Sequence, residues 1–148
     1  MNKKVAKADF GKDFIWGIAA SALQSEGAHD KDGKGVSIWD EFVHQKNTVE
    51  NGDNHFESAN FYTHYEKDIE LIKELGITNF RFSLSWTRIL PNGTGEINQE
   101  GLDFYHKVID CCVAKGITPW VTLYHWDLPK ELESQGGWTN RSILDWFE

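Results

Sequence analysis

The stretch "GITNFRFSLSW" at residues 76–86 indicates the fold of this chain, because a close copy, "GITPWVTLYHW", follows at residues 116–126. Both copies begin with Gly-Ile-Thr, end in Trp, and contain the β-branched and aromatic residues that are typical of a strand. Apolar residues recur at helical spacing before each copy, over 61–75 and over 102–112. The glycine that opens each copy is the residue expected just past a helix. A helix, a glycine and a strand, repeated, predict βα units.

The flanking segments extend this pattern. We expect an earlier strand within "DFIWGIAAS" at 13–21, a helix N-cap at Asn98, and a further helix that begins near Asn140. This order implies parallel strands joined by right-handed crossovers, in either a doubly wound sheet or a (β/α)8 barrel. A doubly wound sheet usually places a glycine-rich phosphate turn after its first strand, but Gly17 is followed by "IAASALQSEGAHD".

The barrel interpretation requires that the chain be a part of a longer one, because a barrel of this class has about 250 residues. The end of the sequence, "SILDWFE", stops within an apolar helical pattern and agrees with this expectation. We therefore predict an α/β fold that forms the N-terminal part, about three of eight βα units, of a (β/α)8 TIM barrel. Residues 1–148 form one incomplete barrel domain in this prediction, and residues 1–9 form a flexible N-terminus.

Alternation along the second predicted strand separates two faces. Phe82, Leu84 and Trp86 point one way and Arg81 points the other. In a barrel the apolar set packs under the helices, so Arg81 is expected in the interior, where a buried guanidinium needs a carboxylate partner. Three strands alone are expected to leave the apolar set partly uncovered.

Composition excludes several classes of function. The net charge of −8 argues against nucleic acid and anionic membrane as partners. No apolar run has the length of a signal peptide core or a membrane span, so we expect a cytoplasmic location. The adjacent Cys111 and Cys112 fit small core positions, and the six His lack metal-ligand spacing. We expect no metal and no cofactor.

The motifs together resemble the family 1 glycoside hydrolases, which are retaining (β/α)8 enzymes of the β-glucosidase type. The matching stretches are "FIWGIAASALQSEGAHDKDGKGVSIWDEF", "YEKDIELIKELGITNFRFSLSWTRILPNGTGEINQEGLDFY" and "GITPWVTLYHWDLPKELESQGGWTNR". The resemblance implies that Gln24, His125 and Trp126 hold hydroxyls of the non-reducing sugar, and that Arg81 supports the nucleophilic carboxylate. Taken alone, His125 and Trp126 would more often be core residues. Their place at the end of a strand, where barrel enzymes build their sites, favours the binding role.

Both catalytic carboxylates that the resemblance implies are absent from this chain. The family takes one from an Asn-Glu-Pro after the fourth strand and the other from a Thr-Glu-Asn-Gly after the seventh. "TVENG" at 48–52 is similar to the second, but Glu50 follows a polar stretch that cannot be a buried strand, so we reject it as a nucleophile. We expect Glu26 and Asp127 to orient loops.

The predicted function is therefore that of a retaining β-glycosidase of the β-glucosidase type, whose small-molecule partner is a β-glucoside or oligosaccharide. Two alternatives stay open: a fragment of a 6-phospho-β-glycosidase, and a non-catalytic sugar-binding or structural fragment. The resemblance indicates that 6-phospho enzymes usually have another residue where Trp126 stands, which favours the unphosphorylated sugar. The aglycone, the preference for glucose or galactose, and the oligomeric state are left open by the sequence.

Overall fold

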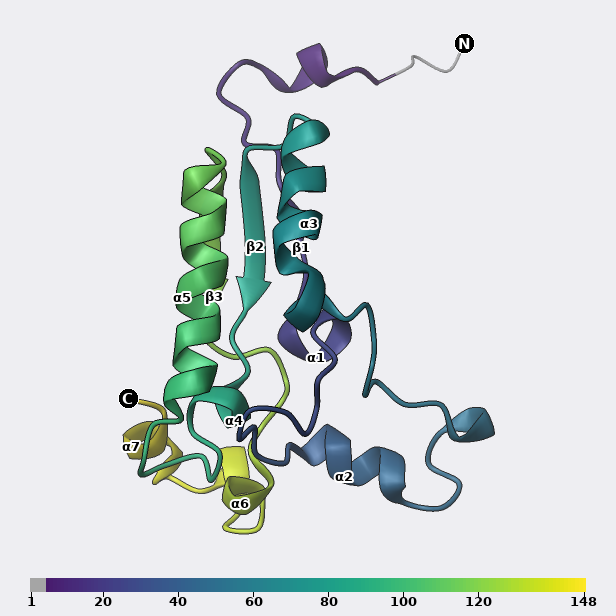
Figure 1. Ribbon diagram of the computed structural model, residues 1–148. Coiled ribbons are helices and arrows are strands. Elements are labelled where there is room, and N and C mark those ends of the chain that lie inside the picture. Colours follow the sequence, from purple (N-terminus) through teal and green to yellow (C-terminus); the bar gives the residue numbers. More distant parts are fainter. Residues whose placement is uncertain (1–4) are drawn as a thin grey trace.

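A parallel sheet of three strands runs through the chain in the order β1 (Ile18–Ala19), β2 (Asn79–Ser83) and β3 (Thr118–Thr122) (Figure 1). The structure is a computed structural model and describes residues 5–148. Phe80 lies opposite Ile18 on one side and opposite Pro119 on the other. Of the predicted flexible segment 1–9, residues 1–4 lie outside the described residues, and Lys7–Phe10 forms the 3-10 turn η1.

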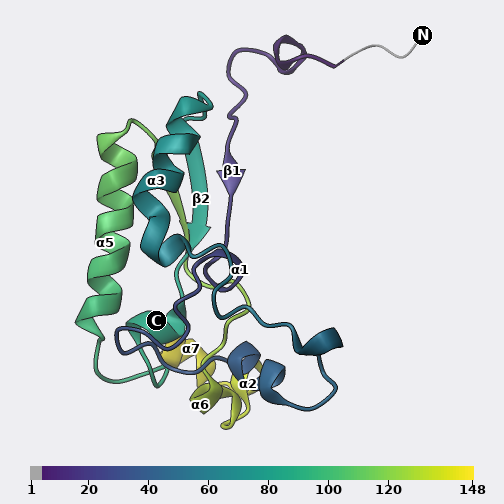
Figure 2. The ribbon, with the colours of Figure 1, turned by 45° about the vertical axis from the view of Figure 1, so that its right-hand side comes forward.

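Two long helices, α3 (Phe61–Glu74) and α5 (Gln99–Ala114), cover one face of the sheet (Figures 1 and 2). Each ends just before a glycine, Gly76 or Gly116, whose φ of +70° or +74° suits a residue without a side chain. The main core lies between the helices and the strands, and its buried members are Phe61, Ile69, Ile72, Phe80, Phe82, Phe104, Tyr105, Val108, Cys112 and Ile117. The predicted βα units are thus confirmed.

Short elements gather where the three strands end (Figure 1). They are α1 (Ala22–Ser25), α2 (Ile38–His44), α4 (Trp86–Ile89), α6 (Lys130–Glu133), the 3-10 turn η3 (Gly137–Thr139) and α7 (Ile143–Phe147). A second core of Trp86, Leu128, Leu132 and Ile143 joins several of them. The 3-10 turn η2 (Glu50–Gly52) lies in the long segment between α2 and α3. In the part of the chain that the structure describes, no helix is long and apolar enough to cross a membrane.

Three local predictions need correction. Asn98 stands at the N-cap position of α5, but its side chain donates to the carbonyls of Asp32 and Arg88 instead of capping the helix. The last helix begins at Ile143 and not near Asn140, because the Asn140 Oδ1 accepts from the Ser142 N–H in a local turn. Pairing in the first strand is limited to Ile18–Ala19, a shorter strand than the predicted segment allows.

The apolar set of the second strand is also better covered than expected. Phe82 and Trp86 are buried, because the two long helices cover the first and the segments after β3 cover the second. Large apolar side chains on and after β3 are exposed, and they include Trp120, Val121, Leu123 and Trp126. This strand has only one neighbour in the described chain.

Candidate sugar-binding site

Gln24 lies on α1, directly after the first strand. The amide N–H of Ala22, the first residue of that helix, donates to the Ser83 hydroxyl at 2.8 Å, so the end of β2 fixes the start of α1. The Gln24 side chain is exposed, and its Oε1 accepts from the Ser21 hydroxyl at 3.0 Å. Its amide nitrogen is therefore available to a ligand at the end of the sheet where sites of this architecture form.

His125 and Trp126 follow the end of β3 at the same edge of the sheet. Their rings lie 4.7 Å apart between centroids at an angle of 37°. His125 is half-buried, whereas Trp126 is 61% exposed. Trp126 has a φ of +74°, a left-handed conformation that is rare for a bulky residue. An imidazole, an indole N–H and an exposed flat ring are groups suited to the hydroxyls and C–H face of a sugar.

The turn that carries Trp126 is held by the start of α2. Trp39 Nε1 donates to the Trp126 carbonyl at 2.9 Å, and the Ile38 N–H donates to the Leu128 carbonyl at 2.9 Å. Ser37 and Pro129 form an isolated antiparallel bridge. Backbone strain persists only where the surrounding structure fixes it, and these contacts from a distant segment supply part of that restraint.

Arg81 lies on β2, on the face opposite the long helices, as the alternation predicts. Its side chain is exposed, because that face of the three-stranded sheet is open, and among residues 5–148 no carboxylate pairs with it. The expectation that Arg81 is buried concerns the interior of a complete barrel, which three strands do not form, so it stays a prediction. Its support of a nucleophilic carboxylate stays a prediction.

The buried guanidinium is instead that of Arg88, in α4. Its Nε donates to the Glu26 carboxylate at 3.0 Å, and its Nη2 donates to the carbonyls of Gly27 and Ala28. Its Cζ lies 4.2 Å from the centre of the Tyr62 ring. Tyr105 donates to the other Glu26 oxygen at 2.6 Å. Burial raises the pKa of Glu26 although Arg88 faces it. This pair joins the loop after β1 to the segment after β2.

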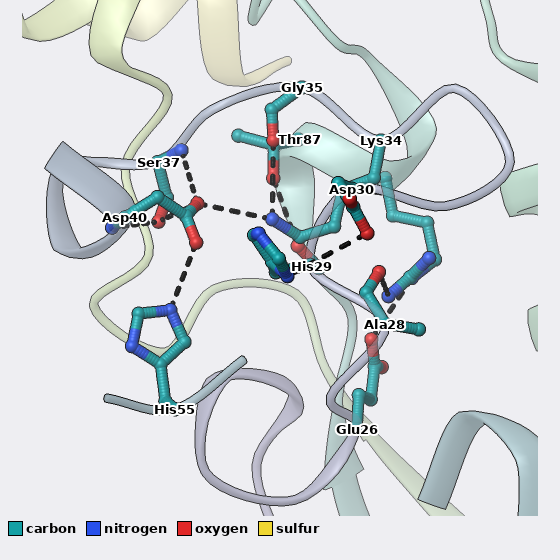
Figure 3. Close-up of polar contacts among 12 residues, drawn as sticks. Glu26, Ala28, His29, Asp30, Lys34, Gly35, Ser37, Asp40, His55 and Thr87 are labelled. Atoms are coloured by element: carbon teal, nitrogen blue, oxygen red, sulfur yellow. Dashed lines mark hydrogen bonds and ion pairs between the residues drawn. The ribbon is translucent and has the colours of Figure 1, made fainter. Parts of the chain in front are cut away.

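A second polar cluster surrounds Asp40, near the start of α2 (Figure 3). One carboxylate oxygen accepts from the Ser37 N–H and hydroxyl, both at 2.7 Å, and from Lys34 at 3.2 Å, while the other contacts His55 Nε2 at 2.9 Å. Burial opposes the ionised form, but the hydrogen bond with His55, the Lys34 charge and the Ser37 contacts together hold the pKa of Asp40 well below its usual range. The cluster fixes the helix that holds the Trp126 turn.

Asp127, in the turn that carries Trp126, lies beside both polar clusters. It is 2% exposed, and neither carboxyl oxygen has a hydrogen-bond partner among residues 5–148. Burial raises its pKa to about 6. Asp127 lines a cavity of about 10 Å³ whose other lining residues are Ala22, Leu23, Glu26, Gly27, His29, Lys34, Ser37, His55 and Ser85.

Leu23, next to Gln24 in the chain, and Asp127, next to Trp126, thus line the same small cavity. A much larger surface hollow of about 910 Å³ lies elsewhere, between the segments 28–31 and 52–63. Neither space is lined by Gln24, His125 or Trp126 themselves. That these three side chains hold one sugar stays a prediction.

Sequence reasoning rejected Glu50, and the structure places it in the exposed turn η2, away from any strand. The same reasoning missed Arg88, Asp40 and His55 as members of buried polar clusters. A signal for Arg88 was present, because it follows Trp86 in a short apolar stretch where a charge is unexpected. The loop-orienting role expected for Glu26 agrees with its contacts to Arg88 and Tyr105.

Comparisons with known proteins define the class. The model of glycosyl hydrolase family 1 matches residues 6–148. The chain is 51% identical over 138 residues to Beta-glucosidase A of Thermotoga maritima, which covers 93% of this chain and 31% of that protein. It is 49% identical over 140 residues to the 6-phospho-beta-glucosidase GmuD of Bacillus subtilis, covering 94% of this chain and 30% of that protein.

The solved structure of the Thermotoga maritima beta-glucosidase in complex with deoxynojirimycin superimposes with a TM-score of 0.89, at 51% identity. The superposition covers 91% of this chain and 30% of that one. The chain therefore belongs to glycosyl hydrolase family 1 and has the fold of the N-terminal part of its TIM barrel. It spans about a third of the length of the curated relatives that it matches.

Proposed function

We propose that residues 1–148 form the part of a retaining β-glycosidase of the β-glucosidase type that binds the terminal non-reducing sugar. The observation that carries this proposal is family membership over 6–148 together with Gln24 and the His125–Trp126 pair after strands of one parallel sheet. Sites of such barrels lie at the carboxyl ends of the strands. The substrate class is a small-molecule β-glucoside or oligosaccharide.

The chemistry assigned to this chain is binding and orientation. Gln24 has an amide, His125 an imidazole and Trp126 an indole N–H, and sugar hydroxyls both donate and accept hydrogen bonds. Retaining hydrolysis needs two carboxyl groups about 5–5.5 Å apart, one as acid and base and one as nucleophile. In this proposal both come from positions outside residues 1–148, and Arg81 on the open face of β2 supports the nucleophile.

Hydrolysis of a 6-phosphorylated β-glucoside is the second candidate, because the identity to the 6-phospho-beta-glucosidase GmuD is nearly as high as that to Beta-glucosidase A. Trp126 favours the free sugar. A non-catalytic sugar-binding or structural role is the alternative outside the enzymes. The cytoplasmic location stays a prediction.

The test uses a complete enzyme, which we define as these residues continued through the rest of a family 1 barrel, from their own gene or from Beta-glucosidase A of Thermotoga maritima. Assays with 4-nitrophenyl β-glucoside, β-galactoside and 6-phospho-β-glucoside compare the candidates. We expect turnover of the unphosphorylated glucoside, with the β-anomer as the first product detected by proton NMR. The α-anomer as first product would refute retention, and preference for the phosphorylated substrate would establish the second candidate.

A matched pair of variants tests the binding assignment. We expect Gln24→Ala to lower kcat/KM by about tenfold or more, because contacts that strengthen in the transition state are lost. Gln135→Ala is the control, since the side chain of this exposed glutamine after α6 donates to the Glu131 carbonyl and makes no other hydrogen bond among residues 5–148. Equal activities of the two variants would remove Gln24 from the site.

A further inference from the structure

The conformation of Trp126 requires a restraint that the described backbone contacts supply only in part. A bulky residue at φ +74° stores about 1–3 kcal/mol of strain and persists only when its surroundings fix it. Trp39 fixes the carbonyl of Trp126 from one side. The next residue in the chain, Asp127, is the buried group on the other side of that peptide.

The Asp127 carboxyl group lacks the hydrogen bonds that a buried polar group requires. A buried polar group without a hydrogen bond costs several kcal/mol, and an ionised one costs more. Asp127 is 2% exposed and has no partner for either oxygen in the described chain. Such a group is explained when a buried water completes its hydrogen bonds.

The cavity beside Asp127 has the size and the polar lining that one buried water molecule requires. Its volume of about 10 Å³ corresponds to the smallest space that holds one water molecule. Lys34, which lines it, donates to Asp40 and to the Gly35 carbonyl, so one of its three ammonium protons remains for a third acceptor. Ser85 and Glu26, both with polar side chains, also line the space.

We propose that Asp127 is a positioning residue for His125 and Trp126, and that its carboxyl group acts through one water molecule in the cavity that it shares with Lys34, Ser85 and Glu26. Glu26 lies two residues after Gln24, so the same cavity ties both sugar-binding segments to one buried polar centre. The effect on activity rests on the proposed function, whereas the water does not.

A crystal structure of the complete enzyme without ligand tests the water. We expect electron density for one water within hydrogen-bond distance of an Asp127 carboxyl oxygen. An empty cavity, or protein groups that donate to both oxygens, would overturn the water-mediated contact. This outcome is independent of whether the enzyme hydrolyses glucosides.

Kinetics of two Asp127 variants test the positioning role. Asp127→Asn keeps the shape and one accepting oxygen, and we expect its kcat/KM to stay within about threefold of the parent. Asp127→Leu has similar size but no polar group, and we expect a loss of about 10- to 100-fold, because small displacements of binding groups weaken transition-state contacts strongly. Asp110→Leu, at an exposed position of α5, is the control and should be neutral.

A double-mutant cycle separates positioning from stability alone. In a His125→Ala/Trp126→Ala background, assayed with an activated dinitrophenyl glucoside, Asp127→Leu should change kcat/KM by less than about threefold. The same large loss in both backgrounds would overturn the positioning role. So would a fall in melting temperature with kcat/KM per folded molecule unchanged. An inactive parent enzyme would instead refute the proposed function and leave the density at Asp127 to decide the water.

Discussion

Replacement of Arg88 by methionine removes the charge that faces Glu26 while it keeps most of the side-chain volume. Arg88 is fully buried and makes three kinds of contact: the ion pair with Glu26, hydrogen bonds to the Gly27 and Ala28 carbonyls, and stacking on Tyr62. After Arg88→Met, Glu26 stays buried with only the Tyr105 hydroxyl as a close donor. We expect the complete enzyme to be clearly less stable.

The magnitude follows from these contacts. Removal of one partner of a buried ion pair costs about 3–5 kcal/mol, because the other charge remains without compensation. A change of about 2–4 °C in melting temperature per kcal/mol applies to chains of 150–250 residues and falls with length. A whole barrel is about three times as long as this chain, so each kcal/mol corresponds to about 1 °C, and we expect a decrease of roughly 3–5 °C. Glu26→Gln in the Arg88→Met background should recover part of this loss, because it removes the stranded carboxylate.

Differential scanning fluorimetry and calorimetry of Arg88→Met, the double variant and the parent at pH 7 measure these shifts. Arg141→Met is the matched control, because Arg141 is exposed before α7. A decrease of less than 2 °C for Arg88→Met, or a double variant less stable than Arg88→Met alone, would refute the reasoning that the ion pair with Glu26 carries this part of the structure.

Three further predictions concern activity and pH. His125→Ala should lower kcat/KM of the complete enzyme by about two orders of magnitude with the fold retained, because several kcal/mol of transition-state contacts are involved. His106→Ala, on the exposed face of α5, is the control. Near-equal kinetics of the two variants would remove His125 from the site. Residues 1–148 alone should not hydrolyse a chromogenic β-glucoside, and turnover that disappears with Glu50→Gln would show that Glu50 was wrongly rejected. Asp40→Asn should destabilise the complete enzyme by about 3 kcal/mol at pH 7. The lowered pKa of Asp40 means that its contribution is present above about pH 4 and is lost on acidification, so the melting-temperature difference from the parent should shrink towards pH 3; a difference that is constant with pH would contradict this.

Local signals were sufficient to predict the βα order and the parallel sheet. The glycines at 76 and 116 mark where each long helix has ended, and the alternation around Arg81 assigned the faces of β2 correctly. Alternation does not show what covers a face, however. Arg81 was therefore expected to be buried, whereas the described sheet leaves it exposed.

The buried polar clusters could not be predicted, because they join residues far apart in the chain. Glu26, just after α1, contacts Arg88 in α4 and Tyr105 in α5. Asp40 in α2 contacts His55, which lies in the long segment between α2 and α3. No local pattern encodes such pairings. No sequence pattern predicts the left-handed conformation of Trp126 either, because only tertiary contacts hold a tryptophan in that conformation.

The contacts between the start of α2 and the turn after β3 have a consequence for how members of this family diverge. The Lys130 N–H donates to the Val36 carbonyl and the Ile38 N–H donates to the Leu128 carbonyl. The Trp39 indole donates to the Trp126 carbonyl, so two stretches far apart in the chain are held together as one structural unit. An insertion or deletion in the first loop would shift Trp126, although no residue near it in the chain had changed. Grafting the turn from one relative to another should therefore succeed only when residues 34–40 and 125–130 are exchanged together.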